Sequence, residues 1–151
     1  MDKYKPKDLL PHKAPMVLID EIVDFSIEKR SLKSKATIKE NDIFYDEKIK
    51  GTTSLIGLEF MAQTVGCLAQ IVKKYSTPKI GFLLGTRMYN NLLEVFPLNS
   101  TYTIEVREEY TDCNISSFSC FIYDNDKEVA SATITAYQSD NIEEMIKERS
   151  K

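Results

Sequence analysis

Residues 54–75 read SLIGLEFMAQTVGCLAQIVKKY, and this stretch decides the fold. Apolar residues recur along it at intervals of three and four, the spacing of one face of an α-helix. We take this set as the core stripe: Leu55, Leu58, Ala62, Val65, Ala69 and Val72. Other apolar residues fill most of the remaining surface: Ile56, Phe60, Met61, Cys67, Leu68 and Ile71. A helix that is apolar on nearly all sides is buried on nearly all sides, so the pattern predicts a helix enclosed by the rest of the chain.

The segments on both sides of this helix are typical of strands. Hydroxyl side chains at 52–54 can cap the helix start, and Pro78 cannot continue the helix. β-branched and partly alternating stretches occupy 16–28 and 33–38 before the helix, and 80–89, 101–110, 115–123 and 129–138 after it. The sequence therefore predicts one α+β domain over residues 1–151, with an antiparallel sheet of five or six strands covering a single long helix.

Composition and charge restrict the class of protein. The chain of 151 residues is 42% hydrophobic and 28% charged, as expected for one globular domain. A formal net charge of -3 argues against nucleic acid as the main partner. Residues 1–10 lack the apolar region of a signal peptide, and no uncharged run approaches the roughly 20 residues of a membrane span. The three cysteines lack CxxC spacing, which favours reduced, mostly buried thiols and a cytoplasmic protein without a metal site.

Glu59 differs from its surroundings on the predicted helix. It is the sole acidic residue between Glu47 and Glu94, and it lies on a polar ribbon with Gln63, Gly66 and Gln70. A carboxylate among apolar side chains is expected to have a raised pKa, and groups of this kind concentrate at functional sites. The alternative is that Glu59 faces a solvated gap or bonds a backbone amide.

His12 is the single histidine of the chain, and it lies between Pro11 and Pro15. The two prolines restrict the backbone of this segment and hold it extended ahead of the first predicted strand. Histidine is the side chain best suited to act as a base near neutral pH. A harmless position on a surface loop is the alternative.

Four motifs in order resemble the 3-hydroxyacyl-acyl-carrier-protein dehydratases. Residues 10–20, LPHKAPMVLID, resemble the family's LPHRYPFLLVD opening, and residues 41–45, NDIFY, resemble its NEPFF segment. Residues 58–63, LEFMAQ, resemble its helix motif LEAMAQ, and residues 81–85, GFLLG, are similar to its next strand. A subgroup associated with aryl-polyene-type acyl chains is closer still, because it pairs a PHxxPM opening with this helix motif.

The resemblance implies a hotdog fold, in which a curled antiparallel sheet wraps a long central helix and two subunits join edge to edge. It also implies a site at the subunit interface, where a helix carboxylate of one subunit meets a histidine of the other. Glu59 matches the family's catalytic carboxylate. The family's GHFP histidine has no counterpart in residues 46–53, so His12 is the available imidazole, with Tyr45 or Asp46 as less favoured substitutes.

For this reaction we expect His12 to remove the α-proton of the thioester and Glu59 to protonate the leaving hydroxyl. Ser54 and Leu55 at the helix start would offer free amides to the thioester oxygen, and Gln63 would orient Glu59 from one turn along. Gly85 joins Ser54, Leu55 and Gln63 as an expected substrate-binding residue. No resident cofactor is expected, since phosphopantetheine arrives with the carrier protein.

The expected partners are an acyl carrier protein and a second hotdog subunit, identical or different. Four cations between 51 and 87 could dock an acidic carrier protein, although solvated charge at a helix end is as plausible: Lys73, Lys74, Lys79 and Arg87. Two other functions stay open. One is a hotdog thioesterase, in which Glu59 activates water, and the other is a non-catalytic subunit of a heterodimer.

Overall fold

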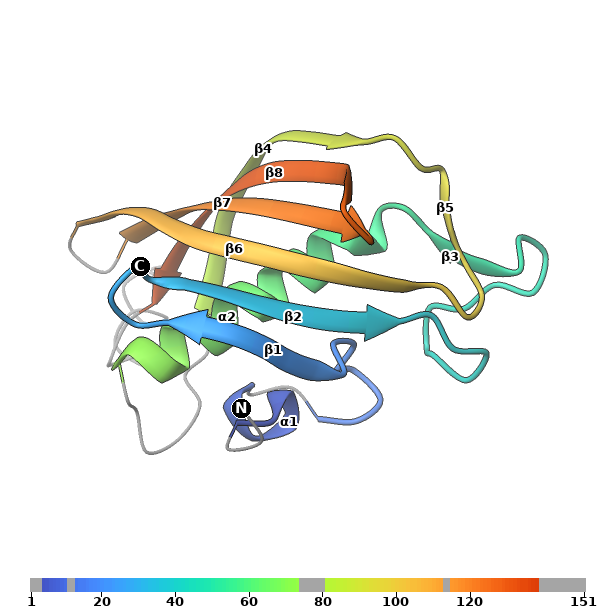
Figure 1. Cartoon of the computed structure of the whole chain (residues 1–151), viewed down its shortest axis with the longest axis horizontal. Helices are drawn as coiled ribbons and strands as arrows, with labels where there is room; N and C mark the ends of the chain where they lie inside the picture. Colours follow the sequence, from blue (N-terminus) through green and yellow to red (C-terminus); the bar gives the residue numbers. More distant parts are fainter. Residues whose placement is uncertain (1–3, 11–12, 74–80, 113–114, 139–151) are drawn as a thin grey trace, which may run out of the picture.

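The computed structural model describes residues 4–10, 13–73, 81–112 and 115–138. Two helices and eight strands lie in these ranges (Figure 1). They are α1 (Pro6–Leu9), β1 (Glu21–Ser26), β2 (Ser31–Thr37), β3 (Gly51–Thr53), α2 (Ile56–Lys73), β4 (Gly81–Asn91), β5 (Val95–Pro97), β6 (Thr101–Asp112), β7 (Ile115–Asp124) and β8 (Lys127–Gln138).

Six of the strands form one antiparallel sheet in the order β1-β2-β6-β7-β8-β4, and β3 pairs with β5 in a small second sheet. Alternate residues of the central strands are buried, so one face of the sheet is apolar and sets the register. Leu32 of β2 pairs with Val106 of β6, for example, and Ala36 pairs with Tyr102. The predicted α+β class and the antiparallel sheet are confirmed, and the sheet curls around α2 (Figure 1).

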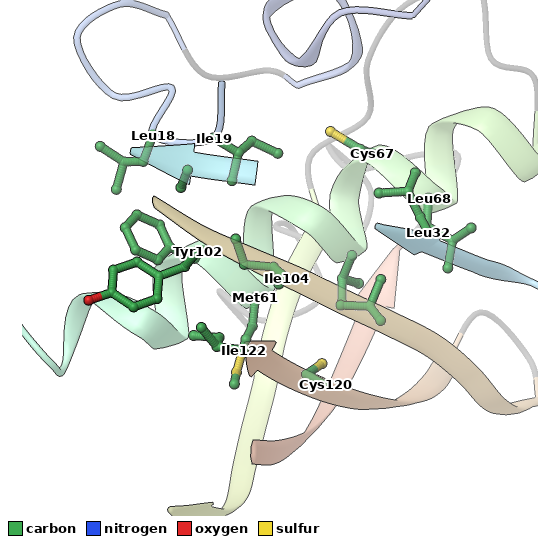
Figure 2. Close-up of a cluster of buried hydrophobic side chains, with 14 of the residues drawn as sticks. Leu18, Ile19, Leu32, Met61, Cys67, Leu68, Tyr102, Ile104, Cys120 and Ile122 are labelled. Atoms are coloured by element: carbon green, nitrogen blue, oxygen red, sulfur yellow. The ribbon is translucent and has the colours of Figure 1, made fainter. Parts of the chain in front are cut away.

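Helix α2 is 18 residues long within the described part of the chain and packs against strands of the large sheet. Met61 and Leu68 of α2 lie among Leu32, Ile104 and Ile122 of the strands (Figure 2). The predicted enclosure of Phe60, Val65 and Ile71 is also confirmed, since each is at most 6% exposed.

The predicted core stripe of α2 is wrong in its orientation. Leu55 is 67% exposed and, of the six residues assigned to the stripe, Val65 alone is buried. The most buried side chains of the helix belong mainly to the other apolar set: Phe60, Met61, Cys67, Leu68 and Ile71. These side chains present more apolar area than the alanines of the predicted stripe, so turning them toward the sheet removes more apolar surface from water.

Three short elements were not predicted: α1, β3 and β5. Gly51–Thr53 forms β3, so α2 begins at Ile56 and not at Ser54. Gly51 permits this pairing, because a Cβ there would lie 2.3 Å from the carbonyl oxygen of Phe96. The first predicted strand is shorter than expected and covers Glu21–Ser26. The helix end beyond residue 73 and the predicted C-terminal helix or tail lie outside the described residues.

Cys67 and Cys120 are buried free thiols, which confirms the prediction for these two cysteines, and Cys113 lies outside the described residues. Burial raises the pKa of each thiol to about 12, so both stay protonated near neutral pH. Within the described residues, neither helix is both long and apolar enough to cross a membrane.

Candidate active site

Glu59 lies in the first turn of α2. This helix follows β3, which pairs with β5 in the small sheet (Figure 1). The Glu59 side chain is partly buried, less enclosed than we expected, because the first turn of the helix is less covered than the turns that follow. The side-chain amide of Gln63, one turn later, donates a hydrogen bond of 3.0 Å to Glu59 Oε1. The predicted contact between the two residues is therefore confirmed.

Gln63 is 1% exposed and uses both ends of its amide group. Its Oε1 accepts a hydrogen bond of 2.9 Å from the backbone N–H of Leu18, and its Nε2 donates one of 2.7 Å to the carbonyl oxygen of Met16. Since the N–H of Leu18 requires an acceptor, the orientation of the amide is determined. The second N–H of Gln63 is then directed to Glu59.

The N-terminal segment covers the polar ribbon of α2. Met16 and Leu18 close over Gln63, and Leu10 lies against Gly66, with its Cδ2 3.1 Å from the place of a Cβ there. The segment that carries the family-like motif at 10–20 therefore packs on the face of the helix that carries Glu59. His12 itself lies outside the described residues, so its contact with Glu59 stays a prediction.

The expected amide donors at the helix start need correction. The N–H of Ser54 is not free, because it donates a hydrogen bond of 3.0 Å to the carbonyl oxygen of Glu94. The N–H of Leu55 lies 3.5 Å from Thr53 Oγ1, at the limit of a hydrogen bond. Gly85 lies exposed on β4, and a Cβ there would meet no atom within 4 Å.

Tyr45 and Asp46, the less favoured candidates for the base, both take part in local hydrogen bonds. The hydroxyl of Tyr45 donates a hydrogen bond of 2.8 Å to Glu47. This bond, with burial and nearby carboxylates, raises the pKa of Tyr45 to about 12, so the phenol stays protonated at neutral pH. Asp46 Oδ1 accepts a hydrogen bond from the N–H of Lys48 in the same turn.

The four cations proposed to dock a carrier protein fall in different parts of the chain. Arg87 is exposed on β4, and Lys73 closes the described part of α2, while Lys74 and Lys79 lie outside the described residues. A cluster of three or more side chains able to hold a metal ion is absent from the described ranges.

The structure adds two residues that were not predicted from the sequence. The side chains of Tyr89 and Asn91 both donate to the carbonyl oxygen of Ser54. Their separation of more than 30 residues from Ser54 leaves no signal in the sequence.

Comparison with known proteins identifies the fold. The dehydratase heterocomplex ApeI:P from Xenorhabdus doucetiae contains a chain with a TM-score of 0.88, 23% identity, and coverage of 98% of this chain and 99% of that one. A hypothetical thioesterase from Streptococcus pneumoniae, solved with coenzyme A, has a TM-score of 0.61 and 13% identity over 79% of this chain and 84% of that one. Both likenesses show the hotdog fold.

Sequence comparison identifies the family. The 3-hydroxyacyl-acyl-carrier-protein dehydratase FabZ of Thiobacillus denitrificans is 31% identical over 86 residues, 55% of this chain and 59% of that protein. The FabZ of Chlamydia pneumoniae is 32% identical over 82 residues, 52% and 54% of the two chains. The chain thus spans about half the length of the curated relatives that it matches. The family model for ApeP-like proteins, described as ApeP dehydratase, matches residues 4–147. The resemblance to the dehydratases is confirmed, and the chain belongs to the ApeP-like dehydratase family.

Proposed function

We propose that this chain dehydrates 3-hydroxyacyl thioesters on an acyl carrier protein to trans-2-enoyl thioesters, with Glu59 as acid and His12 as base. The observation that carries the proposal is the hydrogen-bonded connection through Gln63. It joins Glu59 to Met16 and Leu18, which follow His12 closely in the chain. The names of the FabZ relatives give the reaction class.

The contacts of Glu59 suit a proton donor. Gln63 donates to Oε1, so a protonated Glu59 would carry its proton on the other oxygen, Oε2. In the proposed reaction His12 removes a proton from C2 of the acyl chain, and the C3–O bond breaks as Glu59 protonates the departing hydroxyl. Water and the trans-2-enoyl thioester are the products. The thioester arm arrives with the carrier protein, so the reaction needs no resident cofactor.

We also propose that a second hotdog subunit completes the site. Two features of the chain support this. The flank of α2 that carries Leu58, Ala62 and Ala69 is apolar and partly exposed. Along the edge strand and just after it, Met88 is 78% exposed and Leu92 is 72% exposed, and an open sheet edge must be paired or covered. The likeness to a chain of the ApeI:P heterocomplex makes a different hotdog protein the favoured partner. Exposed Arg87 of β4 would meet the acidic carrier protein near this edge.

A non-catalytic role in such a heterodimer is the second candidate function. The loop before α2 lacks histidine at the place of the family's GHFP motif. The partner would then supply the base, and this chain would contribute the helix, the acyl-binding surface or both. A thioesterase role has support from fold likeness alone.

Enzyme assays of the chain alone, and of the chain expressed with a candidate hotdog partner, test these functions. The substrate is a 3-hydroxyacyl carrier protein, and the readout is the enoyl product by mass spectrometry. Glu59→Gln preserves the shape but removes the transferable proton, so we expect a rate loss of about 10²–10⁴-fold, as for other general acids and bases. His12→Ala should lower the rate by a similar factor, and the exposed control Glu28→Gln should leave it unchanged.

The pattern of losses separates the candidates. Loss in both variants, with a double variant little worse than either, supports a Glu59–His12 pair that acts as one unit. Loss with Glu59→Gln alone points to Tyr45, Asp46 or the partner subunit as the source of the base. Activity of the complex that neither variant lowers shows that this chain is the non-catalytic subunit.

A further inference from the structure

Strand β4 holds the start of α2 on the side away from Glu59, and we propose that Tyr89 is a positioning residue for that carboxylate. The inference rests on the proposed function and adds a residue to it. Tyr89 lies on the edge strand, so it also connects the proposed subunit interface with the proposed site.

Hydrogen bonds from β4 and the segment after it converge on Ser54. The hydroxyl of Tyr89 donates to the carbonyl oxygen of Ser54 at 2.5 Å, and Asn91 Nδ2 donates to the same oxygen at 3.4 Å. Asn91 also donates to the Tyr89 hydroxyl at 2.8 Å. The N–H of Ser54 donates to the carbonyl oxygen of Glu94. Both backbone polar groups of the residue two positions before the helix are therefore fixed by residues 89–94.

Gly57 permits the close approach of Tyr89 to the first turn. A Cβ at Gly57 would lie 2.4 Å from the Tyr89 hydroxyl oxygen and 3.0 Å from Ile122 Cδ1. The N–H of Gly57 donates to the same Ser54 carbonyl oxygen at 3.0 Å. The hydroxyl of Tyr89 is thus in contact with the surface of the turn and bonded to its first carbonyl group.

Glu59 lies on the opposite side of this turn. Gly57 and Glu59 are two positions apart, which corresponds to a rotation of about 200° around an α-helix. The first turn is therefore held between Tyr89 on one side and Gln63 with the N-terminal segment on the other. Burial raises the pKa of Tyr89, although its bond from Asn91 acts in the opposite direction, so the hydroxyl stays a donor at neutral pH.

This arrangement matters for rate because catalytic groups tolerate little displacement. A misplacement of about 1 Å can lower a rate by about 10²-fold. Without the Tyr89 hydroxyl, the carbonyl of Ser54 loses its shortest side-chain bond, and the first turn is held by fewer contacts. Tyr89 lies behind the turn, so the loss should change the rate of the chemical step and not substrate binding.

Steady-state kinetics of Tyr89→Phe in the active complex test the proposal. We expect kcat to fall about 10-fold or more, with KM changed by less than about 3-fold, because the displaced group acts in the chemical step. The matched control is Tyr110→Phe, which removes a hydroxyl from a 62% exposed tyrosine of β6 and should leave both constants unchanged. An unchanged kcat in Tyr89→Phe, or a loss confined to KM, overturns the inference.

A double-mutant cycle with Gly57→Ala adds a second test in folded protein. The alanine methyl would meet the Tyr89 hydroxyl first, so Gly57→Ala should lower kcat more in the native background than in the Tyr89→Phe background. Equal losses of kcat in the two backgrounds would show that the Tyr89 hydroxyl does not influence the first turn of α2, and would count against the proposal.

Hydrogen exchange separates this inference from the proposed function. The amides of Gly57 and Leu58 should exchange about 10-fold faster in Tyr89→Phe than in the native protein, with amides of β6 unchanged. If the native complex shows no dehydratase activity but these amides do exchange faster in Tyr89→Phe, the proposed function fails. The stabilisation of the helix start by Tyr89 is then still supported. If the exchange of these amides is the same in Tyr89→Phe and the native protein, Tyr89 does not stabilise the helix start, and the inference is refuted whatever the activity.

Discussion

Gln63 and Thr64 are neighbours on α2, both polar and both at most 1% exposed, yet they make opposite use of their hydrogen bonds. Thr64 faces the sheet. Its hydroxyl bonds to the hydroxyl of Ser34 on β2 at 2.7 Å and donates to the carbonyl oxygen of Phe60 at 2.7 Å. The partners of Thr64 lie on β2 and on α2 itself, so its hydroxyl joins the helix to the sheet.

Gln63 faces the N-terminal segment and has one bond more than anchoring requires. Two bonds, to Met16 and Leu18, fix the segment to the helix, and the third is directed to Glu59. The difference teaches that burial of a polar side chain on this helix does not distinguish a structural role from a role in the site. The two roles are distinguished by the group that accepts the bond, which is the Glu59 carboxylate for Gln63 and a backbone carbonyl for Thr64.

The largest expected effect comes from Gln63→Leu. This change removes the partners of the buried Leu18 N–H and of the partly buried Met16 carbonyl, and leaves both without these bonds. We expect the free energy of unfolding to fall by about 2–4 kcal/mol, measured by urea denaturation. Activity per folded molecule should fall as well, because Glu59 loses a bond that orients it.

If Gln63→Leu greatly lowers the stability but keeps full activity per folded molecule, Gln63 and Thr64 no longer differ in role. This result would make Gln63 a structural residue like Thr64.

A smaller effect is expected for Thr64→Val, which leaves the buried hydroxyl of Ser34 without its partner. The free energy of unfolding should fall by about 1–2 kcal/mol, with activity per folded molecule unchanged. Removing both hydroxyls in Ser34→Ala/Thr64→Val should recover part of this loss, because no polar atom then remains unbonded. A double variant that is no more stable than Thr64→Val would contradict this account of the pair.

The smallest effect, with the opposite sign, is expected at Thr52 of β3. Thr52 is 2% exposed, and its hydroxyl oxygen has no hydrogen-bond partner within the described part of the chain. Replacing this hydroxyl by a methyl group in Thr52→Val should raise the free energy of unfolding by about 1 kcal/mol, seen as a higher urea midpoint. A lower midpoint would show that the Thr52 hydroxyl makes a hydrogen bond in solution, as the hydroxyls of Ser34 and Thr64 do.

Much of the candidate site could be predicted from local sequence. Glu59 is exceptional within its own stretch of sequence, and Gln63 follows it by one helical turn, so their contact was predictable. The bonds of Gln63 to Met16 and Leu18 were not, because 47 and 45 residues separate the partners. The engaged N–H of Ser54 escaped prediction for the same reason, since its acceptor belongs to Glu94.

The sequence by itself determined the family, the α+β class and the positions of the main helix and strands. Periodicity and short motifs are local properties that a chain carries before it folds. Tertiary structure alone decided which side of α2 meets the sheet, since a helix that is apolar all round has no single preferred face in its own pattern. It also decided that Tyr89 bonds to the helix start and that Gln63 bonds to the N-terminal segment. Such contacts depend on which distant backbone groups the packed core brings within about 3 Å of a side chain.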